Sequence, residues 1–133
     1  MSVNPPDKRV DIAGWIFRLA ITLLFLFAGW AKFDSAPGSM WVKIFAQIGF
    51  GQWFRVATGW IEVGGAVLYL FPRTCRIGAA LLGAAMLGAI IAHLTVLGDP
   101  IAIIIPAALL AAVVIVALRD PSLDLIATHY RRN

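Results

Sequence analysis

The chain has few of the residues from which catalytic and metal sites are usually built. It has one cysteine, Cys75, and two widely separated histidines among 133 residues. A single cysteine excludes an intrachain disulfide and a Cys-x-x-Cys redox relay. A zinc site needs several closely placed Cys, His or carboxylate ligands, and the sequence offers no such group. The sequence therefore assigns no catalytic residue, and it predicts no metal and no covalently bound cofactor.

Charge is scarce as well. Only 14% of the residues are charged and 61% are hydrophobic, whereas soluble domains are about 25% charged and about 45–50% apolar. The mean hydropathy is +0.87. A water-soluble core of this size cannot hide so many apolar side chains, so the bilayer must supply their surroundings. The length fits one domain, residues 1–133, and membrane lipid is the expected environment.

Four apolar runs are each close to the ~20 residues that a helix needs to cross a bilayer. They cover about residues 12–30, 53–71, 77–97 and 101–118. The turn Gly98-Asp99-Pro100 joins the last two runs and forces them to be antiparallel. The pattern predicts an all-α, integral membrane four-helix bundle.

The segment between the first two runs predicts a further, short helix. Residues 34–38 are typical of a turn, and the residues after them are amphipathic, with Lys43 and Gln47 on one face. The other face carries apolar residues at helical spacing, which are Trp41, Ile44, Phe45 and Ile48. We expect a short interfacial helix lying on the outer membrane surface between helices 1 and 2. The alternative is a loop with several aromatic residues.

The basic residues predict the orientation in the membrane. Seven lie on one side of the spans, which are Lys8, Arg9, Arg73, Arg76, Arg119, Arg131 and Arg132. Three lie on the other side, which are Lys32, Lys43 and Arg55. This asymmetry favours a multi-pass protein of the cell inner (plasma) membrane with both termini in the cytoplasm. The net charge of +4 thus indicates topology, and no nucleic acid is expected as a partner. The first run is too long and too polar, at Arg18, for a cleaved signal peptide.

Ionisable side chains inside apolar runs are candidate functional residues, because they are costly in a bilayer. The candidates are Arg18, Lys32, Glu62 and His93. One stripe of the first helix contains Arg18, Thr22, Phe25, Gly29 and Lys32, and one face of the second contains Gly59, Glu62 and Ala66. On the third helix, Ala85, Ala89 and His93 form a row beside Ala80, Ala84, Gly88 and Ala92. Rows of small residues let helices approach closely in lipid.

Depth in the membrane suggests how these groups pair. At 1.5 Å per residue, Arg18 lies about 9 Å from the cytoplasmic side, Glu62 about 14 Å from the outer side and His93 about 6 Å deep. We therefore expect a polar column with a deep Arg18–Glu62 pair and a shallow group of His93 with Lys32 or Asp34. The pair can equally be structural and fix the helix register. In the same structural interpretation, His93 links helices through a hydrogen bond, and the Lys32 side chain extends to the lipid head groups.

Three sequence motifs resemble the DoxX-like family of membrane proteins. The first runs from Arg18-Leu19 to Leu26-Phe27-Ala28-Gly29-Trp30-Ala31-Lys32-Phe33. The second, Gly59-Trp60-Ile61-Glu62-Val63-Gly64-Gly65-Ala66, resembles a G-x-x-E-x-x-G element, and Met86 to His93 resembles an M-x-x-A…H ending. The resemblance covers about residues 12–118 and implies a four-helix membrane bundle. Some members are associated with respiratory or sulfur-linked quinone reduction, others accompany redox or assembly partners, and most have no assigned activity.

The resemblance implies that Arg18, Lys32, Glu62 and His93 are the site residues. A quinone headgroup suits them, because His93, Lys32 and Arg18 can donate hydrogen bonds to its carbonyl oxygens and Glu62 can carry protons. This chain lacks the paired cysteines of related thiol-active quinone reductases, so we do not expect a stand-alone enzyme.

Two hypotheses follow. The chain is an accessory subunit that binds quinone or lipid beside a membrane redox partner, or it is a non-catalytic, chaperone-like subunit for membrane assembly. A proton-linked transporter is a third reading, and the Ala and Gly rows can also pack a homo-oligomer.

Overall fold

The structure, a computed structural model, describes residues 8–119 and is all-helical within them, as expected. The elements in chain order are α1 (Lys8–Ala31), α2 (Met40–Ile48), α3 (Gln52–Leu70), α4 (Cys75–Ala92), the π-helical segment η1 (His93–Leu97), the 3-10 turn η2 (Ile101–Ile103) and α5 (Ile104–Leu118). Arg131 and Arg132, which contribute to the orientation prediction, lie outside the described residues.

Within residues 8–119, three segments are long and apolar enough to cross a membrane. They are Ile12–Ala31, Cys75–Leu97 and Ile101–Leu118. The remaining predicted span, residues 53–71, does form a helix, α3, but α3 is less apolar and is not among the three. Its position accounts for this composition. α3 packs against α1 on one side and α4 on the other, and its charged side chains, Arg55 and Glu62, are buried.

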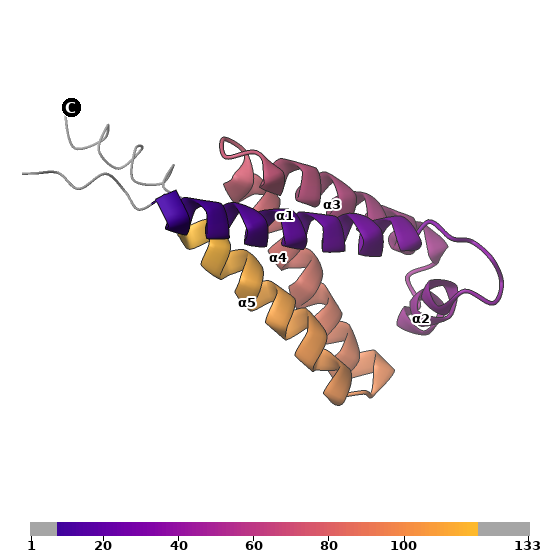
Figure 1. Cartoon of the computed structure of the whole chain (residues 1–133). Helices are drawn as coiled ribbons and strands as arrows, with labels where there is room; N and C mark the ends of the chain where they lie inside the picture. The colour runs from indigo at the N-terminus through magenta and orange to yellow at the C-terminus, as the bar shows by residue number, and fades with distance from the viewer. Residues whose placement is uncertain (1–7, 120–133) are drawn as a thin grey trace, which may run out of the picture.

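Each long helix packs against the next long helix along the chain (Figure 1). α1 and α3 run side by side, α4 packs against α3, and α5 packs against α4 and also contacts α1. The α4–α5 hairpin diverges from α1 and α3 toward the end of the molecule where α2 lies. There α2 contacts both α3 and η1.

Glycines set how closely α3 approaches its neighbours. A Cβ added at Gly78 of α4 would lie 2.3 Å from the backbone N of Tyr69 and 2.6 Å from the carbonyl oxygen of Gly65. A Cβ at Gly29 of α1 would lie 3.0 Å from the carbonyl oxygen of Gly59 on α3. Both helix pairs therefore meet backbone to backbone, which only glycine permits at these points.

The small-residue row predicted on α4 is only partly at a helix contact. Ala85 packs against the buried core, whereas Ala80, Ala84 and Gly88 are exposed. The closest approach of α4 is instead at Gly78. The core formed on this side contains Phe25, Tyr69, Leu82 and Val113, and the Tyr69 hydroxyl donates to the carbonyl of Val113 over 3.1 Å.

The predicted short helix and the predicted last turn are both confirmed. In α2, Phe45 is buried while Lys43 and Gln47 are exposed, as the amphipathic pattern indicated. At the turn, Gly98 has a φ of +65°, and the Asp99 carboxylate accepts hydrogen bonds from the backbone N–H groups of Ile101 and Ala102. The location of α2 on a membrane surface remains a prediction.

Candidate functional site

Lys32 and Glu62 form a buried ion pair between α1 and α3. The Lys32 Nζ donates to Glu62 Oε2 over 2.7 Å, and the two side chains are 6% and 3% exposed. Lys32 follows Gly29 by one helical turn, and Glu62 follows Gly59 in the same way, so the close glycine crossing brings the two side chains together. Side chains tilt toward the N-terminus of their helix, and this directs Lys32 back from the end of α1 toward Glu62.

Arg55 is a second buried cation at the same end of the molecule, and it is 4% exposed. Its Nη1 donates to the carbonyl oxygens of Lys32 and Asp34, and its Nε donates to Gln52 Oε1 over 2.7 Å. The guanidinium thus satisfies carbonyl groups at the C-terminal end of α1, where a cation is favoured by the helix dipole. Arg55 fastens the first turn of α3 to the end of α1.

The helix α2 covers this pair with an aromatic ring. Lys32 Nζ lies 3.9 Å from the centroid of the Trp41 ring, which is within the range of a cation–π interaction. Two contacts hold α2 against α3. The side-chain amide of Gln52 donates to the Val42 carbonyl over 3.1 Å, and the rings of Phe45 and Phe54 lie 5.8 Å apart. We call Lys32, Arg55, Glu62 and Trp41 the polar cluster.

The predicted deep pair of Arg18 with Glu62 is wrong, because the partner of Glu62 is Lys32. Arg18 precedes Lys32 by 14 residues, which is about 21 Å along the helix axis. Its guanidinium lies 5.2 Å from the centroid of the Trp15 ring and 6.0 Å from that of Tyr69, so Arg18 belongs to the opposite end of the α1–α3 pair. The depth estimate assumed that Arg18 extends toward the midplane, whereas its side chain tilts toward the start of α1.

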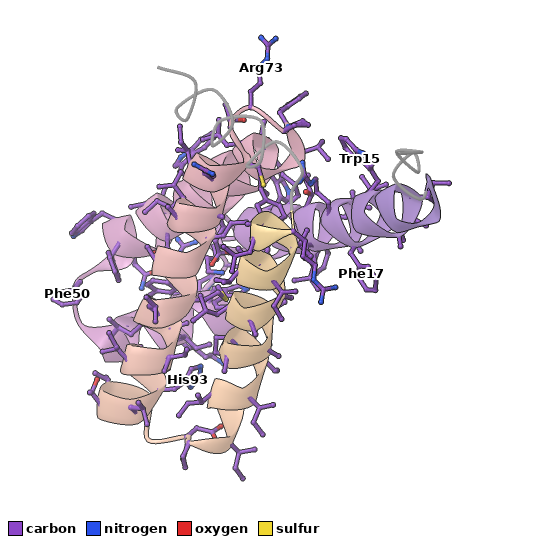
Figure 2. The ribbon with its side chains drawn as sticks, turned by 90° about the vertical axis from the view of Figure 1, so that its left-hand side faces the viewer. Trp15, Phe17, Phe50, Arg73 and His93 are labelled. Atoms are coloured by element: carbon purple, nitrogen blue, oxygen red, sulfur yellow. The ribbon has the colours of Figure 1, made fainter. Side chains whose placement is uncertain are left out.

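His93 does not join the cluster through a hydrogen bond. It is the first residue of η1, near the far end of the α4–α5 hairpin (Figure 2), and its Nδ1 is buried without a hydrogen-bond partner among the described residues. Lys32 donates to Glu62, and the Asp34 carboxylate accepts from the backbone N–H of Ala36. The predicted shallow group of His93 with Lys32 or Asp34 is therefore not formed by hydrogen bonds.

The predicted faces of the first two long helices are confirmed, and two residues of the cluster were missed. All members of the α1 stripe are buried, and so are Gly59, Glu62 and Ala66 on α3. Arg55 had been interpreted only as an orientation signal and Trp41 only as part of an apolar face. A signal for Arg55 was present, because it precedes Glu62 by seven residues and so lies on the same face of the helix.

The cluster offers hydrogen-bond donors, a carboxylate and an aromatic face rather than metal ligands. Among residues 8–119, no group of three or more His, Cys, Asp or Glu side chains is placed to hold a metal ion. Lys32 can donate up to three hydrogen bonds, of which one goes to Glu62 over 2.7 Å and a longer one to the Ala28 carbonyl over 3.5 Å. What the arrangement can do chemically is to hold a polar group of a ligand beside an apolar exterior.

A sequence model described as the DoxX-like family matches residues 16–116, which include every member of the polar cluster. No curated protein and no solved structure matches the chain.

Proposed function

The chain belongs to the DoxX-like family of small membrane proteins, and on this premise we propose that it is an accessory subunit of a membrane redox system. In this proposal the polar cluster binds the head group of a quinone or of a similar lipid-soluble ligand. The observation that supports it is the buried Lys32–Glu62 pair beneath Trp41. A buried ionic pair is expensive in a bilayer, so its presence points to a use beyond packing.

The chemistry of a quinone head group fits these side chains. Each carbonyl oxygen requires a donor, and the Lys32 ammonium has donors beyond the one that Glu62 accepts. Glu62 is an acceptor for the hydroxyl groups of the reduced form. The isoprenoid tail needs an apolar surface, and large apolar residues such as Trp30 and Phe50 are exposed near this end of the molecule.

The redox partner in this proposal is a separate protein. The single cysteine of the chain cannot supply a dithiol, so we expect the electrons to come from a partner subunit. The proposal also includes four spans, with α3 crossing the bilayer between α1 and α4, in the cell inner membrane with both termini cytoplasmic. The excess of basic residues on one side supports that orientation.

The first test is to purify the protein in lipid nanodiscs, extract the lipids and identify any quinone by mass spectrometry. The second is to measure binding of a decyl-substituted 1,4-benzoquinone and of its hydroquinone to the wild type and to the Glu62→Gln and Lys32→Met variants. The quinone tests Lys32 as the donor, and the hydroquinone tests Glu62 as the acceptor. Loss of a charge-assisted hydrogen bond predicts about tenfold weaker binding or more. Lys43→Met is the matched control, because Lys43 is exposed on α2. Absence of a co-purifying quinone, together with equal affinities in all four proteins, would remove the support for this function.

A non-catalytic assembly role is the second candidate, and the completeness of the cluster favours it. Lys32 is paired with Glu62, and Arg55 donates to backbone and amide oxygens. In this second candidate, the charged side chains fix the register of α1 against α3 and have no other role. An assembly subunit is expected to co-purify with a membrane partner at a fixed ratio, without quinone. Recovery of a stable protein with no stoichiometric partner would count against this role.

A further inference from the structure

We propose that Trp41 is the residue on which the ligand ring stacks, and that it selects a planar, electron-poor ring over a phospholipid head group. This inference rests on the proposed function, because it concerns the same site. It assigns the ligand class within that function to quinones.

The position of Lys32 over the indole carries the argument. An ammonium 3.9 Å from the ring centroid occupies the electron-rich face of the indole. An electron-poor quinone ring is attracted to the same negative face. The Lys32 stem is flexible and its ammonium carries several donors, so it can leave the ring face and donate to a quinone carbonyl.

Trp41 differs from the other tryptophans in its surroundings. Trp30, Trp53 and Trp60 are 71%, 68% and 63% exposed and pack against phenylalanine rings, as Trp41 does against Phe45, but Trp41 also carries the Lys32 ammonium on its ring. Trp15 lies near a cation, Arg18, but at the opposite end of α1. Among the described residues, Trp41 is the tryptophan that covers the Lys32–Glu62 pair.

The attachment of α2 determines how a ring can enter. A planar ring between the indole and the ammonium needs about 3.5 Å of additional separation, the contact distance of carbon atoms. Phe45 is buried against Phe54 and anchors α2, and Gly49 and Gly51, both at positive φ, follow the helix. Because the Gln52–Val42 hydrogen bond also holds α2, the room for a ring comes from rotation of the Trp41 side chain away from Lys32 and not from a shift of the helix.

The experiment measures binding to nanodisc-embedded protein for Trp41→Leu, Trp41→Phe and the matched control Trp53→Leu. The probes are a decyl-substituted 1,4-benzoquinone and a short-chain phosphatidylglycerol. We expect Trp41→Leu to weaken quinone binding about tenfold or more, and Trp41→Phe to weaken it by no more than about threefold, because phenylalanine keeps an aromatic face. Trp53→Leu should bind quinone as the wild type does, and phospholipid binding should be the same in all four proteins.

A second measurement does not depend on any variant folding. The 1,4-dimethoxybenzene analogue of the probe has the same decyl chain but an electron-rich ring, and the wild type should bind it about tenfold more weakly than the quinone. Equal affinity for the two rings would overturn the assignment, as would equal quinone binding by Trp41→Leu and Trp53→Leu. In either case the wild type would still bind quinone, so the proposed function would stand. Failure of the wild type to bind the quinone would overturn both proposals.

Discussion

At the scale of single residues, two buried cations lie where the end of α1 meets α3, Lys32 directly after α1 and Arg55 on α3, beside the buried carboxylate of Glu62. The carboxylate pairs with Lys32, while Arg55 is neutralised by the carbonyl dipoles of Lys32 and Asp34. A buried charge is tolerated only when its donors and acceptors are satisfied. The two cations therefore have different roles, and substitutions at Lys32 or Glu62 should differ in their effects from substitutions at Arg55.

Removing one member of the ion pair should destabilise the protein. Glu62→Leu leaves the Lys32 ammonium buried and unpaired, and we expect the unfolding free energy in detergent to fall by about 3–5 kcal/mol. The double variant Lys32→Met with Glu62→Leu should recover most of this loss, because a packed apolar pair can replace a buried ionic one. If the double variant lost as much unfolding free energy as the two single variants together, the pairing would be contradicted.

Arg55 should be important for stability because it joins two helices. Arg55→Met removes the hydrogen bonds to Gln52 and to the carbonyl groups at the end of α1, and we expect a loss of about 3 kcal/mol or more. The exposed Arg76 provides the control, and Arg76→Met should change the unfolding free energy by about 0.5 kcal/mol or less. Equal effects of the two substitutions would show that Arg55 has no such role.

The sequence could predict that Lys32 and Glu62 are buried, but not that they pair, and it did not identify Arg55 as a member of the site. A carboxylate in an apolar run and a stripe at helical spacing identify Glu62 and Lys32 without coordinates. The pairing depends on the direction in which each side chain leans and on where the helices cross. The crossing is set by Gly29 meeting Gly59, and spacing along one helix does not specify a contact with another.

At the scale of the elements, α3 and α4 approach each other most closely at Gly78, and this gives a sharp prediction. Gly78→Ala places a Cβ against the Tyr69 backbone, which cannot move aside as a flexible side chain can. We expect a loss of several kcal/mol or failure to fold, of the order found for overpacked interiors. The control is Gly88→Ala on the same helix, where nothing lies within 4 Å, and it should be neutral or stabilising by up to about 1 kcal/mol. Circular dichroism melts of the two variants in one detergent compare them directly.

The helices themselves were predictable, and the contact face of α4 was not. Apolar runs, the amphipathic segment of α2 and the turn at Gly98 each correspond to an element that formed. Most side chains of α4 are small and apolar on all sides of the helix, so no polar face indicates which side contacts the neighbouring helices. Rows at Ala80 and Gly88 therefore resembled contact rows, although the structure leaves them exposed.

At the scale of the whole molecule, the proposed topology places α3 across the bilayer between α1 and α4. On the proposed topology, Ser35 lies outside and Arg73 lies in the cytoplasm, because α3 separates them. In intact cells, a membrane-impermeant thiol reagent should label Ser35→Cys, and it should label Arg73→Cys only after permeabilisation. The native Cys75 is buried and should react little in either case. Labelling of both positions from the same side would contradict a crossing α3.

The central position of α3 has a consequence for how the protein is made. This helix is the least suited of the four long ones to leave a translocon unaided, since it carries Arg55 and Glu62 and is not among the apolar spans. When it emerges from the ribosome, α1 has already been synthesised and α4 has not. We therefore expect the nascent chain to insert α3 as a hairpin with α1, with Lys32 neutralising Glu62 before the rest of the protein exists. Biogenesis would then depend on the order of the helices along the chain as much as on their final contacts.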